Sequence, residues 1–492
     1  MELAADLRRA LDGVCAIGVP EVRENGQWLA GLQGAQYEVS AQGDAALLHL
    51  WSAQQSLVRR VLRVAEESRE RVVLEVSRFG FSRPAQLEFV AGGAQRETRR
   101  VEREQFSTRL RRILNDHFPD ETLESLVTAA DLHHSISGSY TRGILRRGSQ
   151  AFAVLGASPS EDAATIDGIL TFGLICLQQA RDRARRYSVY GLRLFIPRGK
   201  SLVTAHRMAA LASPQEVEIY EYEPVYWRVR RMARSNAGNS DTCIIPRREI
   251  EQIIAAAMPL AERIRRLAPD AIQIGVAMGA QEVTLRFRGL EFARWRMGQM
   301  WYGLGDHQTV LTVGKWDALE SLVRQLELHR HLLATETKHR LYRAQPERWL
   351  ETMVAADPPR IDARLDPRYI YSQVPAFSSG DRGIIDLLGV TRDGRLAVLE
   401  LKASEDIHLV MQAVDYWLRV RTHHQQDDFG RYGYFPELRL NAKPPLLFLV
   451  APGFRFHPST DIVLRYLSSE IEITRVALAE NWRRGLQVVF RQ

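Results

Sequence analysis

The sequence predicts an α/β protein with a mixed sheet and flanking helices at its C-terminus, a degenerate repeat of that core in its first half, and a β-rich module at its N-terminus. Three observations predict this organisation. Short segments of alternating apolar and polar residues occupy residues 1–100. Continuous apolar strands alternate with helices in residues 101–235 and again in 345–492, and these two stretches align with each other. Residues 236–344 are expected to form a connector of helices and a β-hairpin pair.

Composition narrows the classes of protein to consider. The chain has 492 residues, with 66 Lys and Arg against 59 Asp and Glu, so its formal net charge is +7, which favours polyanionic partners such as nucleic acids. Cys15, Cys176 and Cys243 lie far apart without CxxC spacing, which argues against a disulfide framework or structural zinc and favours a reducing cytoplasm. Because no segment has about eighteen consecutive apolar residues, we expect neither a signal peptide nor a membrane partner.

The N-terminal module, residues 1–100, is rich in period-two segments such as AQYEVSA, ALLHLWS, ERVVLEVSRFG and PAQLEFV. Basic and aromatic side chains are interleaved in it, a composition that could contact phosphates and bases. A small β-sandwich with a solvated basic face explains the same pattern equally well. The side chains concerned are Arg59, Arg60, Arg63, Arg69, Arg71, Arg78, Arg83, Trp51, Phe79 and Phe81.

The first α/β stretch, residues 101–235, begins with a helix that has apolar residues on one face, from Phe106 to Leu114. The segments that follow predict a strand (AFAVLGA), a long helix (ATIDGILTFGLICLQQARD), a strand (YGLRLFIP), a short helix (around TAHRMAALA) and a last strand (EVEIYEYE). The polar residues 233–242 then indicate a linker.

The connector, residues 236–344, is expected to begin with a helix and to continue with two segments, IQIGVAMG and EVTLRFRGLEFARW, that read as a hairpin pair. Helix-forming residues from Trp316 onward predict one long helix, and Pro346 predicts the start of a new one. His329, His331 and His339 lie on the long helix, but spacings of two and eight residues do not share one helical face, so we expect no metal there.

An internal duplication explains the similarity of the two α/β stretches. Without a gap, AVLGASPSED (153–162) aligns with AVLELKASED (397–406), and each segment precedes a long apolar helix. Further on, residues 191–211 match residues 445–467 in the order of their elements.

The second copy contains a group of residues with catalytic potential. Asp386 lies at the end of one strand, a turn with Asp-Gly follows, and the next strand carries Glu400 and Lys402, which face the same side. Two carboxylates and the carbonyl of Leu401 could bind Mg²⁺ or Mn²⁺, and the lysine could position or deprotonate water or stabilise charge on a phosphate. A purely structural ion pair is the alternative, but two buried carboxylates without a cation would be costly.

This arrangement resembles the PD-(D/E)xK nuclease superfamily, over about residues 345–470. The resemblance implies a restriction-endonuclease-like mixed-sheet core in which Asp386, Glu400 and Lys402 take the motif positions, while Ile385 stands where the name has proline. It also implies an acidic residue on the preceding helix, for which Glu347 is preferred over Glu351, one turn later on the same face.

The spacing of Gln412 and Tyr416 is similar to the QxxxY signature of RecB-like nucleases. A basic β module ahead of a C-terminal nuclease also resembles, more weakly, the NucS-type endonucleases. The implied metal ligands are Asp386, Glu400, the Leu401 carbonyl and Glu347, with Gln412 and Tyr416 beside them.

We therefore expect a Mg²⁺-dependent nuclease that hydrolyses DNA, working alone, as a homodimer or with a partner protein. A non-catalytic nucleic-acid-binding scaffold with a retained nuclease fold and an RNA-directed nuclease are the alternatives.

The first copy should be structural, because Gly156, Ser158, Gly168 and Phe172 align with Glu400, Lys402, Gln412 and Tyr416. A cluster of Asp131, His133 and His134 is not expected to support independent metal chemistry. Basic residues of this copy are expected to bind the nucleic-acid backbone without reading sequence: Arg142, Arg146, Arg147, Arg198 and Lys200.

Overall fold

A computed structural model describes residues 2–492 apart from several short segments. The segments outside the described part are 18–19, 25–26, 32–34, 43–44, 53–55, 69–70, 78–83, 91–95, 130–135, 137, 234–243, 278–280, 306, 338 and 377–382. The chain forms two compact units. The first unit comprises Met1–Asn239, Glu405–Met411 and Phe456–Ser468, and the second comprises Ser240–Ser404, Gln412–Arg455 and Ser469–Gln492.

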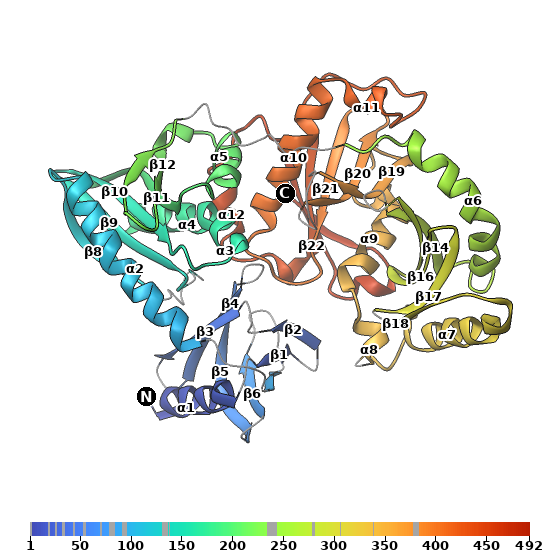
Figure 1. Ribbon diagram of the computed structural model, residues 1–492, viewed down its shortest axis with the longest axis horizontal. Coiled ribbons are helices and arrows are strands. Elements are labelled where there is room, and N and C mark those ends of the chain that lie inside the picture. The colour runs from blue at the N-terminus through green and yellow to red at the C-terminus, as the bar shows by residue number, and fades with distance from the viewer. Residues whose placement is uncertain are drawn as a thin grey trace. The chain divides into compact units, whose positions relative to one another are not determined.

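The N-terminal part of the first unit is a seven-stranded sheet with strand order β2-β1-β7-β6-β5-β4-β3, covered by helix α1 (Glu2–Ile17) (Figure 1). All its neighbouring strands are antiparallel, and Leu7, Leu11 and Val14 of α1 pack against apolar residues of the strands. The predicted β-rich character is confirmed. The strands are β1 (Glu21–Glu24), β2 (Gln27–Gly31), β3 (Ala35–Gln42), β4 (Ala45–Ser52), β5 (Ser56–Glu67), β6 (Arg71–Ser77) and β7 (Ala85–Val90).

The second sheet, also in the first unit, is mixed and has the order β13-β12-β11-β10-β9-β8. Strands β10, β11 and β12 are parallel, and the remaining pairs are antiparallel. The predicted strands and helices of this stretch are confirmed. Its elements are α2 (Arg96–His117), β8 (Thr122–Val127), β9 (Tyr140–Arg147), β10 (Gln150–Ala157), α3 (Ala163–Asp167), α4 (Ile169–Arg183), β11 (Ser188–Pro197), α5 (Leu202–Met208), β12 (Val217–Tyr222) and β13 (Val229–Arg231).

The connector contains more strand and less helix than expected. Instead of a hairpin pair, five antiparallel strands form a meander in the order β14-β15-β16-β17-β18. Helices α6 and α7 contribute apolar side chains to its core, including Ala261, Ile264, Leu319 and Val323. The elements are α6 (Arg248–Arg265), β14 (Ile272–Ala277), β15 (Glu282–Phe287), β16 (Leu290–Arg296), β17 (Gln299–Leu304), β18 (His307–Val310), α7 (Trp316–His329) and α8 (Arg340–Arg343).

The expectation of one long helix from Trp316 is wrong, because α7 ends at His329. Arg330 follows with a fully buried side chain, and its guanidinium donates hydrogen bonds to the carbonyls of Phe287, Arg288, Leu341 and Ala344. The Arg330 side chain can reach all four carbonyls only if the chain turns back after His329. These tertiary contacts therefore end the helix although the following residues have high helix propensity. The predicted new helix at the proline is confirmed as α9 (Pro346–Ala356).

The fourth sheet repeats the second. Its order is β19-β20-β21-β22-β23-β24, and its sequence of antiparallel and parallel pairs matches that of β8 to β13 strand for strand. The α/β class is confirmed, and the shared topology supports the duplication. The elements are β19 (Leu365–Pro375), β20 (Ile384–Thr391), β21 (Leu396–Leu401), α10 (Leu409–Gln425), α11 (Asp428–Arg431), β22 (Leu446–Pro452), α12 (Thr460–Leu464), β23 (Ile473–Leu478) and β24 (Val488–Arg491).

Within the first unit, equivalent residues of the two copies pair with each other. Leu211 and Leu467, the last residues of the matched segments, form an isolated antiparallel bridge. Ala212 N donates to Tyr466 O at 2.9 Å, and Ser468 N donates reciprocally to Ala210 O at 2.8 Å. These contacts hold the segment Phe456–Ser468 within the first unit.

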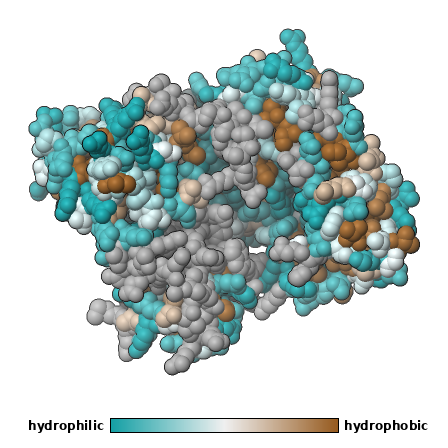
Figure 2. All heavy atoms as spheres, viewed as in Figure 1, coloured by the Kyte–Doolittle hydropathy of each residue, from teal (hydrophilic) through white to brown (hydrophobic). Residues whose placement is uncertain are grey.

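Among the described residues, no helix is both long and apolar enough to cross a membrane. Hydrophilic residues predominate on the face drawn in Figure 2, where hydrophobic residues gather in small, separate groups.

Candidate active site

A β-hairpin in the second unit brings the two predicted carboxylates together. Strands β20 and β21 are antiparallel, and the pairing of Leu387 with Leu399 sets Asp386 opposite Glu400 one step along the ladder. The turn between the strands contains Gly394, whose φ of 83° suits a residue without Cβ; a Cβ there would lie 2.2 Å from the Arg439 carbonyl oxygen. This local geometry follows from the Asp-Gly turn, as expected.

Glu400 is the most constrained residue of the hairpin. Its side chain is 1% exposed, and its Oε1 lies 3.3 Å from Nζ of Lys402, as same-face positions on a strand predict. Its Oε2 is buried without a hydrogen-bond partner among the described residues. A buried carboxylate oxygen that accepts no hydrogen bond is rare, and it marks a place for a proton, an ion or water.

The pKa values of Asp386 and Glu400 reflect the burial of these two carboxylates next to each other. Burial, together with the charge of the neighbouring Asp386, raises the pKa of Glu400 well above its ordinary value, although Lys402 acts in the opposite direction. Burial also raises the pKa of Asp386 above its ordinary value. The charge of Lys402 and a hydrogen bond from the backbone N–H of Leu401 to Asp386 Oδ2, 2.9 Å long, oppose this effect but do not cancel it. Two adjacent buried carboxylates therefore favour binding a positive charge.

Of the two candidate helix acids on α9, Glu351 is held by other residues. It is 2% exposed, and its Oε2 accepts hydrogen bonds from Arg348 at 2.8 Å and Gln373 at 2.7 Å, while Arg286 lies 3.6 Å from Oε1. Burial raises the pKa of Glu351 to about 8, against the opposing effect of Arg348. These partners account for both oxygens of this carboxylate.

Glu347, one turn earlier, has a different relation to the hairpin. Its side chain is half-buried, and its charge raises the pKa of both Asp386 and Glu400. It therefore acts electrostatically on both carboxylates of the hairpin, and Asp386 in turn raises the pKa of Glu351, so both helix acids interact with the hairpin.

Gln412 and Tyr416 also meet beside this site. They lie one turn apart on α10, and Gln412 Nε2 donates to Tyr416 Oη at 3.0 Å. The Tyr416 side chain is buried; burial and then the charge of Glu400 raise its pKa. Tyr416 therefore lies near enough to Asp386 and Glu400 to feel their charges, and Gln412 is joined to it by a hydrogen bond.

The donor set fits a small, hard cation. Within the described part of the chain, no three His, Cys, Asp or Glu side chains converge closely enough to hold a metal by themselves. Asp386 and Glu400 supply carboxylate oxygens, and the carbonyl of Leu401 lies at the end of the same strand. Mg²⁺ uses few protein oxygens and retains several waters, so it could bind such an incomplete set. Glu400 Oε2, which has no hydrogen-bond partner among the described residues, is an oxygen available to it.

Two histidines after β18, His329 and His339, contact one another, and His329 also contacts an acidic residue. The rings of His329 and His339 stack with centroids 3.6 Å apart, and His329 Nδ1 lies 3.4 Å from Glu336. No metal-binding group that includes either ring, or His331, occurs in the described residues. Asp131, His133 and His134 lie outside the described residues.

The corresponding site of the first copy is closed. A Cβ on Gly156, the counterpart of Glu400, would lie 2.8 Å from Leu110 and 3.1 Å from Phe106. The apolar face of α2 thus fills the space that a carboxylate would need. Ser158, the counterpart of Lys402, shares a 2.9 Å hydrogen bond with Ser160. The expectation of a structural first copy agrees with this packing.

The sequence did not reveal how the loop after Lys402 is held within the first unit. Phe172, the counterpart of Tyr416, contacts the ring of His408 at a centroid distance of 5.4 Å, and a Cβ on Gly168 would lie 2.8 Å from that ring. The degenerate site of the first copy therefore receives a side chain from the segment that leads into α10. A glycine in place of Gln412 is the signal that could have indicated this close contact.

Arg59 holds the same segment. Its side chain is buried, contrary to the expectation that it lies on a basic surface. It forms an ion pair with Glu24 at 2.8 Å and approaches Glu405 at 3.7 Å. The reason is that the alternation of β5 directs residue 59 inward, where two carboxylates compensate the burial of its charge.

The other basic residues proposed as phosphate contacts are largely engaged with the protein. Arg146, Arg147 and Arg198 face Glu124, Asp120 and Glu223, and Arg142 donates to the carbonyl of Ala129. Lys200 is exposed.

In the N-terminal module, Arg63 pairs with Glu75 and Arg71 with Glu66, whereas Arg60 is exposed. Arg69, Arg78, Arg83, Phe79, Phe81 and the side chain of Trp51 lie outside the described residues.

Comparisons with known proteins supply no family or relative for this chain. No protein-family model matches the chain, and no curated protein matches it.

Proposed function

We propose that the chain is a divalent-metal-dependent nuclease that hydrolyses phosphodiester bonds of DNA, with its active site at Asp386, Glu400 and Lys402. The observation that carries the proposal is the buried Glu400 Oε2, which has no hydrogen-bond partner in the described part of the chain. Glu400 also lies beside the carboxylate of Asp386, and its Oε1 is 3.3 Å from Nζ of Lys402. A restriction-endonuclease-like core is proposed for the fourth sheet on the same ground, together with its order β19 to β24.

In this proposal Asp386, Glu400 and the Leu401 carbonyl would hold Mg²⁺ or Mn²⁺, with Glu347 close to that ligand set. The ion would supply Lewis-acid polarisation of the phosphate and a lower pKa for bound water. A water oxygen attacks phosphorus, the bond to the bridging oxygen breaks, and that oxygen leaves with a proton.

Each side chain then has a defined task. Lys402, kept near Glu400, would orient the attacking water or stabilise charge on the phosphate. Gln412 and Tyr416 would orient the carboxylates, since their hydrogen bond directs the hydroxyl at the site.

A second candidate is a non-catalytic scaffold that binds nucleic acid. The observation in its favour is the formal net charge of +7, which attracts nucleic acid whether or not the chain cleaves it. An RNA-directed nuclease would use the same site on another substrate.

The deciding experiment incubates the full chain with single-stranded and duplex DNA and RNA, with Mg²⁺ or Mn²⁺ and with EDTA. Asp386→Ala, Glu400→Ala and Lys402→Ala should each abolish cleavage while preserving the circular-dichroism spectrum. If all three variants cleave at the wild-type rate, the active-site assignment is wrong. Absence of cation binding by the wild type would favour the scaffold.

A further inference from the structure

We propose that a cleft on the first α/β copy, between the second half of α2 and the β12–β13 hairpin, is a binding site for a single-stranded nucleic-acid segment with an unstacked base. The cleft has a volume of about 490 Å³. Its lining residues are Arg109, Arg112, Ile113, Asp116, His117, Tyr226, Trp227 and Val229. This inference depends on the proposed function in one respect: both take nucleic acid as the molecule that the protein binds.

The first argument concerns charge. Arg109 and Arg112 are exposed on α2, and within the described part of the chain neither forms an ion pair with a carboxylate. Asp116 is the one carboxylate among the described lining residues. Arginines of this kind bind phosphate through charge and a planar set of donors. They contrast with Arg146 and Arg147 of the same copy, which face carboxylates.

The second argument concerns aromatic rings. Tyr226 lies at the tip of the hairpin with 71% of its surface exposed, although large aromatic side chains are usually buried. Its neighbour Trp227 is fixed: it stacks on Tyr222 with centroids 5.2 Å apart and planes at 8°, and Arg109 Cζ lies 4.6 Å from its ring centroid. A presented ring next to phosphate-binding cations is the arrangement that binds single strands, because every base has a face that can stack.

The third argument is that the hairpin presents this ring in a defined position. Trp227 N donates to Glu223 O at 2.7 Å, and Glu223 N donates to Arg228 O at 2.9 Å, so the turn is closed by backbone hydrogen bonds. Trp227 has a positive φ of 59°, which the stacking on Tyr222 helps to maintain. The backbone that carries Tyr226 is therefore already ordered before a base stacks, which lowers the entropic cost of binding.

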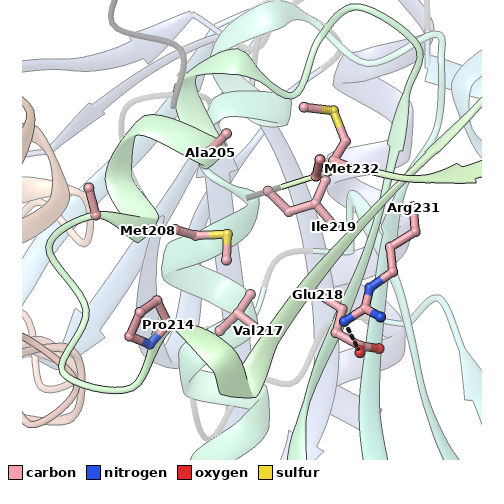
Figure 3. Close-up of a pocket in the computed structure, with 10 residues that line it drawn as sticks. Ala205, Met208, Pro214, Val217, Glu218, Ile219, Arg231 and Met232 are labelled. Atoms are coloured by element: carbon pink, nitrogen blue, oxygen red, sulfur yellow. Dashed lines mark hydrogen bonds and ion pairs between the residues drawn. The ribbon is translucent and has the colours of Figure 1, made fainter. Parts of the chain in front are cut away.

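A second hollow in the same copy lacks these features. It has a volume of about 520 Å³ and lies between α5 and the strands β12 and β13 (Figure 3). Met208, Val217 and Ile219 give it apolar walls, and its charged pair, Arg231 and Glu218, is neutralised internally at 2.6 Å. The described lining of this hollow therefore offers a phosphate no cation that is not already paired.

The test measures binding by the full-length protein in EDTA, where metal-dependent cleavage cannot occur. The probes are fluorescein-labelled oligothymidylate, oligouridylate and a DNA duplex, followed by fluorescence anisotropy at several salt concentrations. Tighter binding of the single strands than of the duplex is expected, and the DNA and RNA arms show which backbone is preferred. Equal or tighter binding of the duplex would overturn the proposal.

Two variants test the contacts. Tyr226→Ala should weaken single-strand binding about 5- to 150-fold, the range for loss of one stacked base. Arg109→Gln with Arg112→Gln should reduce the slope of log affinity against log salt by about 1.4, since each phosphate contact contributes about 0.7. All three positions are exposed, so folding should be preserved.

Matched controls come from the same copy. Arg111 is exposed on α2 but does not line the cleft, and Tyr190 on β11 is 53% exposed. Arg111→Gln and Tyr190→Ala should bind as the wild type does. If the controls lose as much affinity as the cleft variants, or if the cleft variants lose none, the proposal is refuted. Because no cleavage is measured, this outcome is independent of whether Asp386 and Glu400 support catalysis.

Discussion

Replacing Glu400 with glutamine tests the candidate site most directly. The change keeps the shape of a side chain that is 1% exposed but removes the carboxylate whose Oε2 has no partner. A ligand present at a hundred times its dissociation constant stabilises a folded protein by about 2.7 kcal/mol. For a unit of this size that corresponds to an increase in Tm of about 5–10 °C. We expect Mg²⁺ or Mn²⁺ to raise the Tm of the wild type and to leave that of Glu400→Gln unchanged.

The pH dependence of this shift gives a second measurement. The raised pKa values of Asp386 and Glu400 mean that the folded protein binds protons more tightly than the unfolded chain. Without metal, the contribution of these two groups to stability is therefore largest below the ordinary carboxyl pKa of about 4 and is lost as pH rises toward the raised values. A cation removes that cost, so its stabilising effect should grow with pH in the wild type. The glutamine variant should show a flatter pH profile without metal.

Cleavage should fall in parallel by at least about 100-fold, because metal ligation contributes several kcal/mol to such transition states. Asp366→Asn is a suitable control: Asp366 is a buried carboxylate of β19, but Arg368 binds it at 2.7 Å. This variant should keep both the cation-induced rise in Tm and cleavage. A Glu400→Gln protein that retains either property would refute the assignment of a cation to this hairpin.

Three further predictions follow from particular contacts. Lys402→Met should lower the single-turnover cleavage rate about 100-fold or more while the cation still raises Tm, and wild-type turnover would contradict its role. Arg59→Ala leaves two carboxylates without their cation and should cost about 3–5 kcal/mol in denaturant unfolding, whereas the exposed Arg60→Ala should change stability by less than about 0.5 kcal/mol. Gly156→Ala forces a methyl group to 2.8 Å from Leu110 and should cost about 1–3 kcal/mol; an unchanged unfolding midpoint would show that α2 does not close the first copy.

Local patterns in the sequence were sufficient for much of the molecule. Period-two and continuous apolar segments located some strands of every sheet, such as β3, β10 and β21, but missed others, such as β1, β5 and β8; Pro346 marked the start of α9. Register alone was enough to place Asp386 opposite Glu400, because a hairpin closed by Asp-Gly leaves little freedom in pairing. These features depend on residues within about twenty positions of one another, so their physical cause is visible in the chain itself.

Contacts between distant segments could not be predicted in this way. The end of α7 depends on Arg330 reaching carbonyls of β15 and α8, and the burial of Arg59 depends on Glu405, almost 350 positions away along the chain. The partners of Glu351, Arg286 and Gln373, likewise come from strands that the local sequence does not place beside α9. A single residue's preference cannot encode such partners, because burial of charge is favourable only where the compensating group is already in place.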